Sequence, residues 1–264
     1  MLMKAIVVNE HGGAEVLQYQ DAQMPMPGPT QVLIRVSAAS VNFADIKERI
    51  GKFHSTKKPP YIPGIDVTGI IEAVGSRVTK FRPGQRVVAF CSSGSYAEYT
   101  VAEEVLTYPV ADHVDTDTAA AFPVVSFTSY NLLVQCARLQ PGETVLIHAA
   151  AGGIGTTSIQ IAKWLGAGMV IGTVGSAAKA AIALEAGADH VINYNETDFV
   201  REVLRLTHQK GADVILDSLA GEVFGQSLGC LSMFGRIVNF GNAKESAGGE
   251  VNTRQLHESC RSVI

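Results

Sequence analysis

The sequence lacks the features of a secreted, membrane-spanning or nucleic-acid-binding protein. Its four cysteines, Cys91, Cys136, Cys230 and Cys260, form no CxxC pair, which argues against a redox dithiol or a structural zinc knuckle. No apolar run approaches the ~20 residues that cross a bilayer, and the first residues contain no signal-peptide pattern. The formal net charge of −4 gives no broad attraction to nucleic acid or to an anionic membrane. We therefore expect a cytoplasmic protein whose partners are small molecules.

The chain does contain two halves with different patterns. Residues 1–123 hold short apolar runs separated by glycine and proline, which predicts a mainly β domain resembling a compact barrel. These runs are Ala5–Val8, Val32–Val36, Val67–Val74, Arg86–Phe90 and Tyr96–Val101. A long helix is predicted over Thr118–Leu139, across the boundary between the halves. The rest of the second half, 124–264, alternates β-type runs with helical stretches.

The alternation in the second half predicts an α/β fold. The expected strands are Glu143–Ala149, Met169–Val174, His190–Asn193, Asp213–Asp217 and Arg236–Phe240. Because these strands are apolar throughout and are joined by helices, they predict a parallel, doubly wound sheet with helices on both faces. The last three residues, Ser262–Ile264, resemble the opening of a sixth strand. We therefore expect a fold that is incomplete at its C-terminal end.

A glycine-rich turn follows the first of these strands. Ala150, Gly152, Gly153, Ile154 and Gly155 lie between an apolar strand and a helix, which is the context of a dinucleotide site. A diphosphate must approach the backbone closely, and the N–H groups at a helix start favour an anion. Because Ala150 replaces the first glycine of the GxGxxG motif, a tight turn that binds nothing is the structural alternative.

The end of the second strand favours NADPH over NADH. NAD sites usually place a carboxylate there, but this chain has Thr173-Val174-Gly175-Ser176. Ser176 as a donor and Lys179 as a nearby cation would instead suit the 2′-phosphate of NADPH. The alternative for Lys179 is an ordinary solvated lysine on a surface helix.

Four motifs in register carry a family resemblance. AAAGGIG, SVNFADIKERIGKF, PGIDVTGIIEAVG and GSYAEYTV together resemble the zinc-independent quinone oxidoreductase (zeta-crystallin-like) branch of the medium-chain dehydrogenase/reductase superfamily. The resemblance implies a GroES-like catalytic domain at 1–123 and a Rossmann NADP-binding domain at 124–264, with the active site in the cleft between them. It also implies that this chain lacks the usual C-terminal return segment, and that the full-length form is a homodimer.

The resemblance also bears on metal binding. Zinc-dependent relatives place a cysteine and a Gly-His-Glu triplet where this chain has Asp45 and Ile65-Asp66. We therefore expect no catalytic metal. The alternative is a site built from scattered histidines, such as His11, His54 and His113.

Without zinc, simple alcohols are poor substrates because nothing acidifies their hydroxyl group. Hydride addition to a quinone, an enone or an enal needs only modest hydrogen-bond help, since the product anion is delocalised. The sequence therefore predicts an NADPH-dependent reductase of such acceptors. The alternative is an NADPH-binding structural or regulatory protein, crystallin-like or RNA-binding, with little turnover.

The resemblance suggests the remaining site residues. Asn42 and Thr128 are the catalytic candidates, and Tyr194, Ser218, Phe240, Gly241 and Asn242 are further cofactor-binding candidates. The structural alternatives are a turn-forming side chain for Asn42, a helix residue bonding a preceding carbonyl for Thr128, and a core or loop tyrosine for Tyr194.

The proton donor has no candidate in the sequence. Family members often carry tyrosines after the asparagine motif, where this chain has Lys47 and Phe53. We therefore assign no general acid and expect water to protonate the product, so that Asp45→Asn changes turnover only a few fold.

Overall fold

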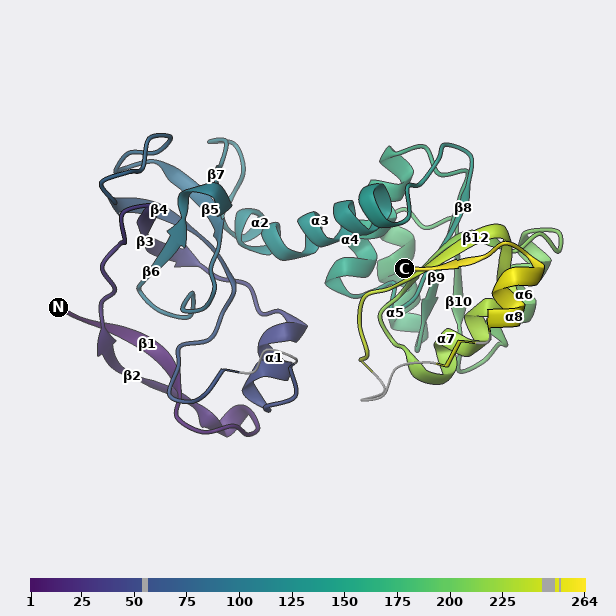
Figure 1. The fold of residues 1–264 in the computed structure, drawn as a ribbon, viewed down its shortest axis with the longest axis horizontal. Helices are drawn as coiled ribbons and strands as arrows, with labels where there is room; N and C mark the ends of the chain where they lie inside the picture. Colours follow the sequence, from purple (N-terminus) through teal and green to yellow (C-terminus); the bar gives the residue numbers. More distant parts are fainter. Residues whose placement is uncertain (54–56, 244–249, 252) are drawn as a thin grey trace. The chain divides into compact units, whose positions relative to one another are not determined.

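The computed structural model describes residues 1–53, 57–243, 250–251 and 253–264, so that His54 lies outside the described residues. The chain divides into two compact units, Met1–Val124 and Val125–Ile264 (Figure 1). Each unit is described by itself below. Among the described residues, no helix combines the length and the apolar character needed to cross a bilayer.

Unit 1 is built on two antiparallel sheets. The larger has the order β6-β3-β4-β5-β7, and the smaller pairs β1 with β2. The strands are β1 (Leu2–Val8), β2 (Leu17–Gln23), β3 (Gln31–Ala38), β4 (Asp66–Val74), β5 (Arg86–Phe90), β6 (Tyr99–Glu103) and β7 (Thr107–Pro109). The helices are α1 (Phe43–Arg49) and α2 (Thr116–Ala121), with single turns η1 (Ala14–Val16) and η2 (Glu104–Leu106).

The apolar runs of the first half do become strands, because they contribute side chains to two buried clusters. Val32, Ile34, Val67 and Ile71 are fully buried between β3 and its neighbours. Strand β2 was not predicted, because it is mostly exposed and carries mostly polar residues. The sequence analysis also missed α1, although its start has a capping signal: Asn42 and Asp45 form a reciprocal capping box.

Unit 2 contains one six-stranded parallel sheet of order β10-β9-β8-β11-β12-β13. Its strands are β8 (Thr144–Ile147), β9 (Met169–Val174), β10 (His190–Asn193), β11 (Ala212–Asp217), β12 (Leu231–Asn239) and β13 (Ser262–Val263). Its helices are α3 (Pro123–Tyr130), which starts at the boundary between the units, η3 (Asn131–Cys136), α4 (Gly153–Trp164), α5 (Ala177–Glu185), α6 (Phe199–Leu206), α7 (Gly221–Ser227), η4 (Leu228–Cys230) and α8 (Thr253–Glu258). The predicted parallel sheet and its sixth strand are confirmed, since β13 pairs in parallel with β12.

The long helix predicted over Thr118–Leu139 was wrong as a single element. The chain forms α2, breaks at Phe122, and restarts with Pro123 as the first residue of α3. Proline is tolerated at the start of a helix but lacks the N–H that an interior position requires. The stretch ends in η3, a wider π-helical segment that buries Leu132 and Leu133.

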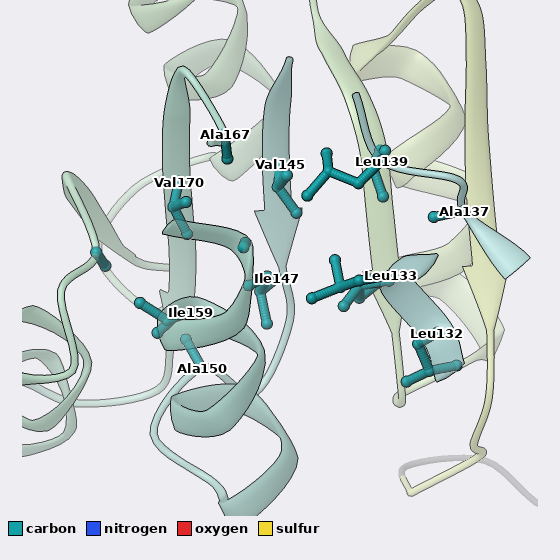
Figure 2. Close-up of a cluster of buried hydrophobic side chains, with 14 of the residues drawn as sticks. Leu132, Leu133, Ala137, Leu139, Val145, Ile147, Ala150, Ile159, Ala167 and Val170 are labelled. Carbon is teal, nitrogen blue, oxygen red and sulfur yellow. The ribbon is translucent and has the colours of Figure 1, made fainter. Parts of the chain in front are cut away.

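Packing on both faces explains why the strands of unit 2 are apolar throughout. On one face, Leu133 and Leu139 point toward Val145 and Ile147 of β8 (Figure 2). The opposite face of the same sheet packs against α6, α7 and η4 through a second cluster that includes Leu146, Ile215, Phe199, Phe224 and Leu228. This packing fixes the positions of the carboxyl ends of the strands along one edge of the sheet.

Candidate active site

The glycine turn joins β8 to α4 with an open helix start. Ala149 adopts φ +51°, and the N–H of Ala150 donates to the carbonyl of Thr173 at 3.0 Å, which ties the turn to β9. Helix α4 begins with Gly152 as its N-cap, and no side chain caps it. The first N–H groups of the helix therefore have no acceptor within it.

Two glycines of the turn are needed for different reasons. A Cβ on Gly155 would lie 2.5 Å from the carbonyl oxygen of Ala149, so that only glycine lets α4 approach the turn. A Cβ on Gly152 would meet only that same oxygen, at 3.3 Å, and the backbone there has an ordinary φ of −82°. The fold thus gives little reason for glycine at 152. An open backbone with uncapped N–H groups is a cradle that fits a diphosphate.

Helices α5 and α6 are capped by side chains, in contrast to α4. The Asp198 side chain accepts hydrogen bonds from Val200 N at 2.9 Å and Arg201 N at 3.2 Å at the start of α6. Ser176 caps α5 by accepting from Lys179 N at 3.4 Å. Helix α7 shares the uncapped start, since its N-cap Ala220 has no side chain that caps it, but α4 alone of the two begins in the glycine turn.

Ser176 and Lys179 lie together in the first turn of α5, after the end of β9. The Ser176 hydroxyl acts as the acceptor in the cap, so its own proton can still be donated to an anion. The Lys179 side chain is exposed. Beside them, the Tyr194 hydroxyl lies so close to Gly175 that a Cβ there would be 2.6 Å from it. This edge of the sheet thus combines a cation, a hydroxyl donor and an aromatic ring.

Hydrogen bonds of Asp217 and Asn239 join the carboxyl ends of β11 and β12. One oxygen of Asp217 accepts from the N–H groups of Leu219 (2.8 Å) and Ala220 (3.2 Å). The other accepts from Asn239 Nδ2 at 3.0 Å, and the same nitrogen donates to the carbonyl of Gly241 at 3.2 Å. These bonds hold the chain around the predicted residues Ser218, Phe240, Gly241 and Asn242.

A pocket of about 680 Å³ opens at this edge of unit 2. Of the predicted site residues only Tyr194 lines it, together with residues the sequence analysis did not single out. Among these are His148, Thr173, Leu219 and Glu222. Three of these residues could have been found from the sequence, because they lie at or just beyond the carboxyl end of a predicted parallel strand, where ligands bind in such sheets.

His148 is the least expected of these residues, because it is only 2% exposed. Ser227 donates its hydroxyl proton to Val223 O at 2.7 Å, so it accepts from His148 Nε2 at 2.9 Å. His148 Nδ1 lies 2.9 Å from the Thr173 hydroxyl, within hydrogen-bond distance. His148 thus joins β8, β9 and α7 at the pocket.

In unit 1 the catalytic candidate Asn42 is buried in a polar network. Its side-chain NH₂ donates to Ser40 Oγ at 3.1 Å and to Asp66 Oδ1 at 3.0 Å. Its side-chain oxygen accepts from the Asp45 N–H in the capping box, and its own N–H donates to Asp45 Oδ2 at 2.8 Å. The structure thus gives Asn42 the turn-forming role that the sequence left as the alternative, with both amide hydrogens already used.

Two buried carboxyl groups complete this network. Asp66 is 1% exposed, and it accepts from Ser40 Oγ at 2.7 Å and from Val124 N at 3.3 Å. Asp45 is 5% exposed, and its Oδ2 also accepts from the Tyr96 hydroxyl at 2.9 Å. Burial raises the pKa of both carboxyl groups, although their hydrogen bonds oppose the shift. Burial and the neighbouring Asp45 likewise raise the pKa of Tyr96.

The other candidates lie apart from these clusters. Thr128 is a half-buried residue of α3 in unit 2. Ala150 and Ile154 pack their side chains against the core, leaving their backbone at the turn. His11 and His113 are exposed, and across the described ranges no group of three or more His, Cys, Asp or Glu is arranged to hold a metal ion.

Two family models match the chain in register with its two units. The alcohol dehydrogenase GroES-like domain matches residues 28–112, and the zinc-binding dehydrogenase domain matches residues 153–264. The quinone oxidoreductase of Rattus norvegicus is 40% identical over 265 residues, covering 100% of this chain and 79% of that protein. The chain belongs to the quinone oxidoreductase family.

Other quinone oxidoreductases are also similar to this chain over most of its length. The enzyme of Pseudomonas aeruginosa is 41% identical over 244 residues, which cover 92% of this chain and 74% of its own. The crystal structure of the Escherichia coli quinone oxidoreductase complexed with NADPH superposes with a TM-score of 0.92 at 35% identity, covering 99% of this chain and 80% of that one. The predicted family and the GroES-like plus Rossmann fold class are confirmed.

Proposed function

We propose that this quinone oxidoreductase family member is an NADPH-dependent reductase of quinones and of enones or enals, and that it works without zinc. The observation that carries the proposal is the open start of α4, where Gly152 leaves backbone N–H groups uncapped and unobstructed. The Escherichia coli relative bound to NADPH supports the same cofactor.

In this proposal, different residues of unit 2 bind different parts of the cofactor. The start of α4 would bind the diphosphate, and Ser176 with Lys179 would bind the 2′-phosphate. Tyr194 and Ser218 would contact the adenosine half, with Phe240 to Asn242 near the nicotinamide. When bound, the nicotinamide supplies the hydride, and the chain supplies binding, orientation and electrostatics.

The residues at the expected zinc positions support a metal-free reaction. Both carboxyl oxygens of Asp66 and one of Asp45 accept hydrogen bonds inside unit 1, and Ile65 offers no ligand atom. Without a Lewis acid, acceptors that delocalise the added charge are favoured over simple alcohols.

Gly152→Ala tests the diphosphate cradle directly. The added Cβ has one close neighbour in the fold, so we expect the free energy of unfolding to change by less than about 1 kcal/mol. NADPH affinity should fall at least about tenfold, or about 1.4 kcal/mol, because the methyl group obstructs the diphosphate. Calorimetric titration and urea unfolding measure the two effects, and unchanged NADPH affinity would remove the turn from the site.

Lys179→Ala tests the choice of nucleotide. Removing the cation should weaken NADPH about tenfold while leaving NADH nearly unchanged, since only NADPH carries the 2′-phosphate. Lys210→Ala is the matched control, because Lys210 is also exposed but precedes β11 at the amino end of the strands. Equal losses for both nucleotides would remove Lys179 from this role.

Turnover distinguishes the enzyme from a protein that only binds NADPH. NADPH absorbance should fall when quinones, enones or enals are added to the wild-type chain, whereas binding without oxidation would favour a structural or regulatory role. We also infer a cytoplasmic location and a homodimer. Light scattering on the purified protein tests the dimer.

A further inference from the structure

Two loops of unit 2 that carry proposed cofactor residues lie side by side. The β11 loop (218–220) follows β11, and the β12 loop (240–243) follows β12. The N–H of Ala243 donates to the carbonyl of Ser218 at 2.9 Å, which joins the loops directly. In the proposed function the β11 loop contacts the adenosine half of NADPH, and the β12 loop lies near the nicotinamide. The spacing of the two loops therefore decides whether both ends of one cofactor molecule can be bound together.

The buried side chain of Asp217 connects these two loops. Its Oδ1 accepts from the N–H groups of Leu219 and Ala220 in the β11 loop, at 2.8 and 3.2 Å. Its Oδ2 accepts from Asn239 Nδ2 at 3.0 Å, and that nitrogen also donates to the carbonyl of Gly241 in the β12 loop. Asp217 is 0% exposed, so all these bonds lie away from water. Each oxygen of one carboxyl group thus holds a different loop.

The β11 loop needs this support because its backbone is strained. Ala220 has φ +58° and ψ −163°, a conformation that residues with a side chain rarely adopt. Such strain persists only where the surrounding structure enforces it, and the hydrogen bond to Asp217 supplies part of that constraint. Leu219 on one side of the strained residue and Glu222 on the other both line the pocket of about 680 Å³. Asp217 does not line the pocket itself, but its bonds determine the shape of one wall.

A second carboxyl group of the same strand has no such connection. Asp213 lies near the amino end of β11, where its Oδ2 accepts from Thr144 N at 2.8 Å and its Oδ1 from Ser232 Oγ at 3.0 Å. These bonds join β11 to β8 and β12 at the edge of the sheet opposite the glycine turn. Asp213 and Asp217 are therefore chemically alike, but only Asp217 holds the loops of the proposed cofactor site.

We propose that Asp217 is a positioning residue for NADPH. It fixes the β11 loop and the β12 loop at the spacing that lets one cofactor molecule contact both. It acts through the loops it holds and does not touch the cofactor. This inference rests on the proposed function, because it places NADPH at the carboxyl ends of the strands of unit 2.

Asp217→Asn in the full chain breaks the link between the loops while keeping the size of the side chain. The amide oxygen can still accept from Leu219 and Ala220, but the amide NH₂ would face the NH₂ of Asn239, and two donors form no hydrogen bond. NADPH should bind about tenfold more weakly, because its two ends then contact loops that are no longer fixed relative to one another. Removing a negative charge would by itself strengthen the binding of an anion, so a loss of affinity points to the broken link.

A fragment of the cofactor separates positioning from general damage. Adenosine 2′,5′-bisphosphate carries only the adenosine half, so its affinity for Asp217→Asn should change by less than about twofold. Asp213→Asn is the matched control, which should lower the stability of unit 2 and leave both affinities unchanged. Calorimetric titration with each ligand and urea unfolding measure these effects.

Three results decide the proposal. Unchanged NADPH affinity in Asp217→Asn, or equal weakening of NADPH and the bisphosphate, would overturn it. If Asp217→Asn fails to fold, Asn239→Ala breaks the same link from an exposed residue, and the same difference between the two ligands is expected. A wild-type chain that binds neither ligand would instead refute the proposed function itself.

Discussion

Two buried carboxyl groups of unit 1 and two ion-paired carboxyl groups of unit 2 have pKa values that are shifted in opposite directions. In unit 1, Asp45 and Asp66 are surrounded mainly by neutral donors, and burial raises their pKa. In unit 2, Glu143 is paired with Arg236 at 2.6 Å and Asp189 with Lys163 at 2.8 Å. Both carboxyl groups have a lowered pKa, because these partners, together with the N–H groups of Gln140 and Val170, outweigh burial, which is the largest single effect. In unit 2 these two ion pairs therefore favour the carboxylate forms, whereas the fully buried Asp217 of the same unit is held by neutral donors.

The largest effect expected from this comparison is the loss of the Arg236 pair. Arg236 also donates to the carbonyls of Ala137 and Arg138. Arg236→Met would leave Glu143 mostly buried and unpaired, and should destabilise unit 2 by about 3 kcal/mol. Urea unfolding followed by peptide-resolved hydrogen exchange measures this. Adding Glu143→Met should restore part of the loss, and an unchanged single variant would show that the pair is not structural.

A smaller effect should follow from Gly155→Ala, which separates packing from binding within unit 2. The new Cβ would collide with the carbonyl of Ala149, so α4 must shift, at a cost of about 2 kcal/mol. Thermal unfolding measures the loss. Gly152→Ala is the control, because its new Cβ would lie 3.3 Å from the nearest atom and should disturb the packing little. Equal destabilisation by the two variants would show that Gly155 is not needed more than Gly152 for packing.

The smallest effect is a pH-dependent difference between the units. A raised folded-state pKa gives stability that is present below the unfolded pKa of about 3.9 and is lost as pH rises through the folded value. The lowered pKa values of Glu143 and Asp189 act in the opposite sense, giving stability that is lost as pH falls. As pH falls from 7 toward the unfolded pKa of about 3.9, exchange protection should therefore rise in β4 relative to β8.

Two exposed carboxylates of unit 1 need a control in that experiment. The pKa of Glu104 and that of Asp115 are lowered by hydrogen bonds, chiefly from the Lys80 N–H and the Thr118 side chain respectively. Measuring Glu104→Gln/Asp115→Asn removes their contribution. No relative change between β4 and β8 in that background would contradict the comparison.

The sequence predicted what depends on local pattern. The strands of unit 2 and the glycine turn were recognisable because each apolar run is followed by a helix. The break at Phe122 and Pro123 was missed because a proline at the first position of a helix looks the same in sequence as one that kinks it. The network around Asp45 could not be predicted, since Tyr96 and Asp66 reach it from distant segments that only the folded sheet brings together.

Helix α4 has a practical consequence at its far end. It is 12 residues long, ends with Trp164, and carries the only tryptophan of the chain. At 1.5 Å per residue, that indole is about 17 Å from the helix start, and it is 74% exposed. Its emission can therefore pass by resonance energy transfer to a reduced nicotinamide held by unit 2. The protein carries its own optical reporter for titrations, and no dye label is required.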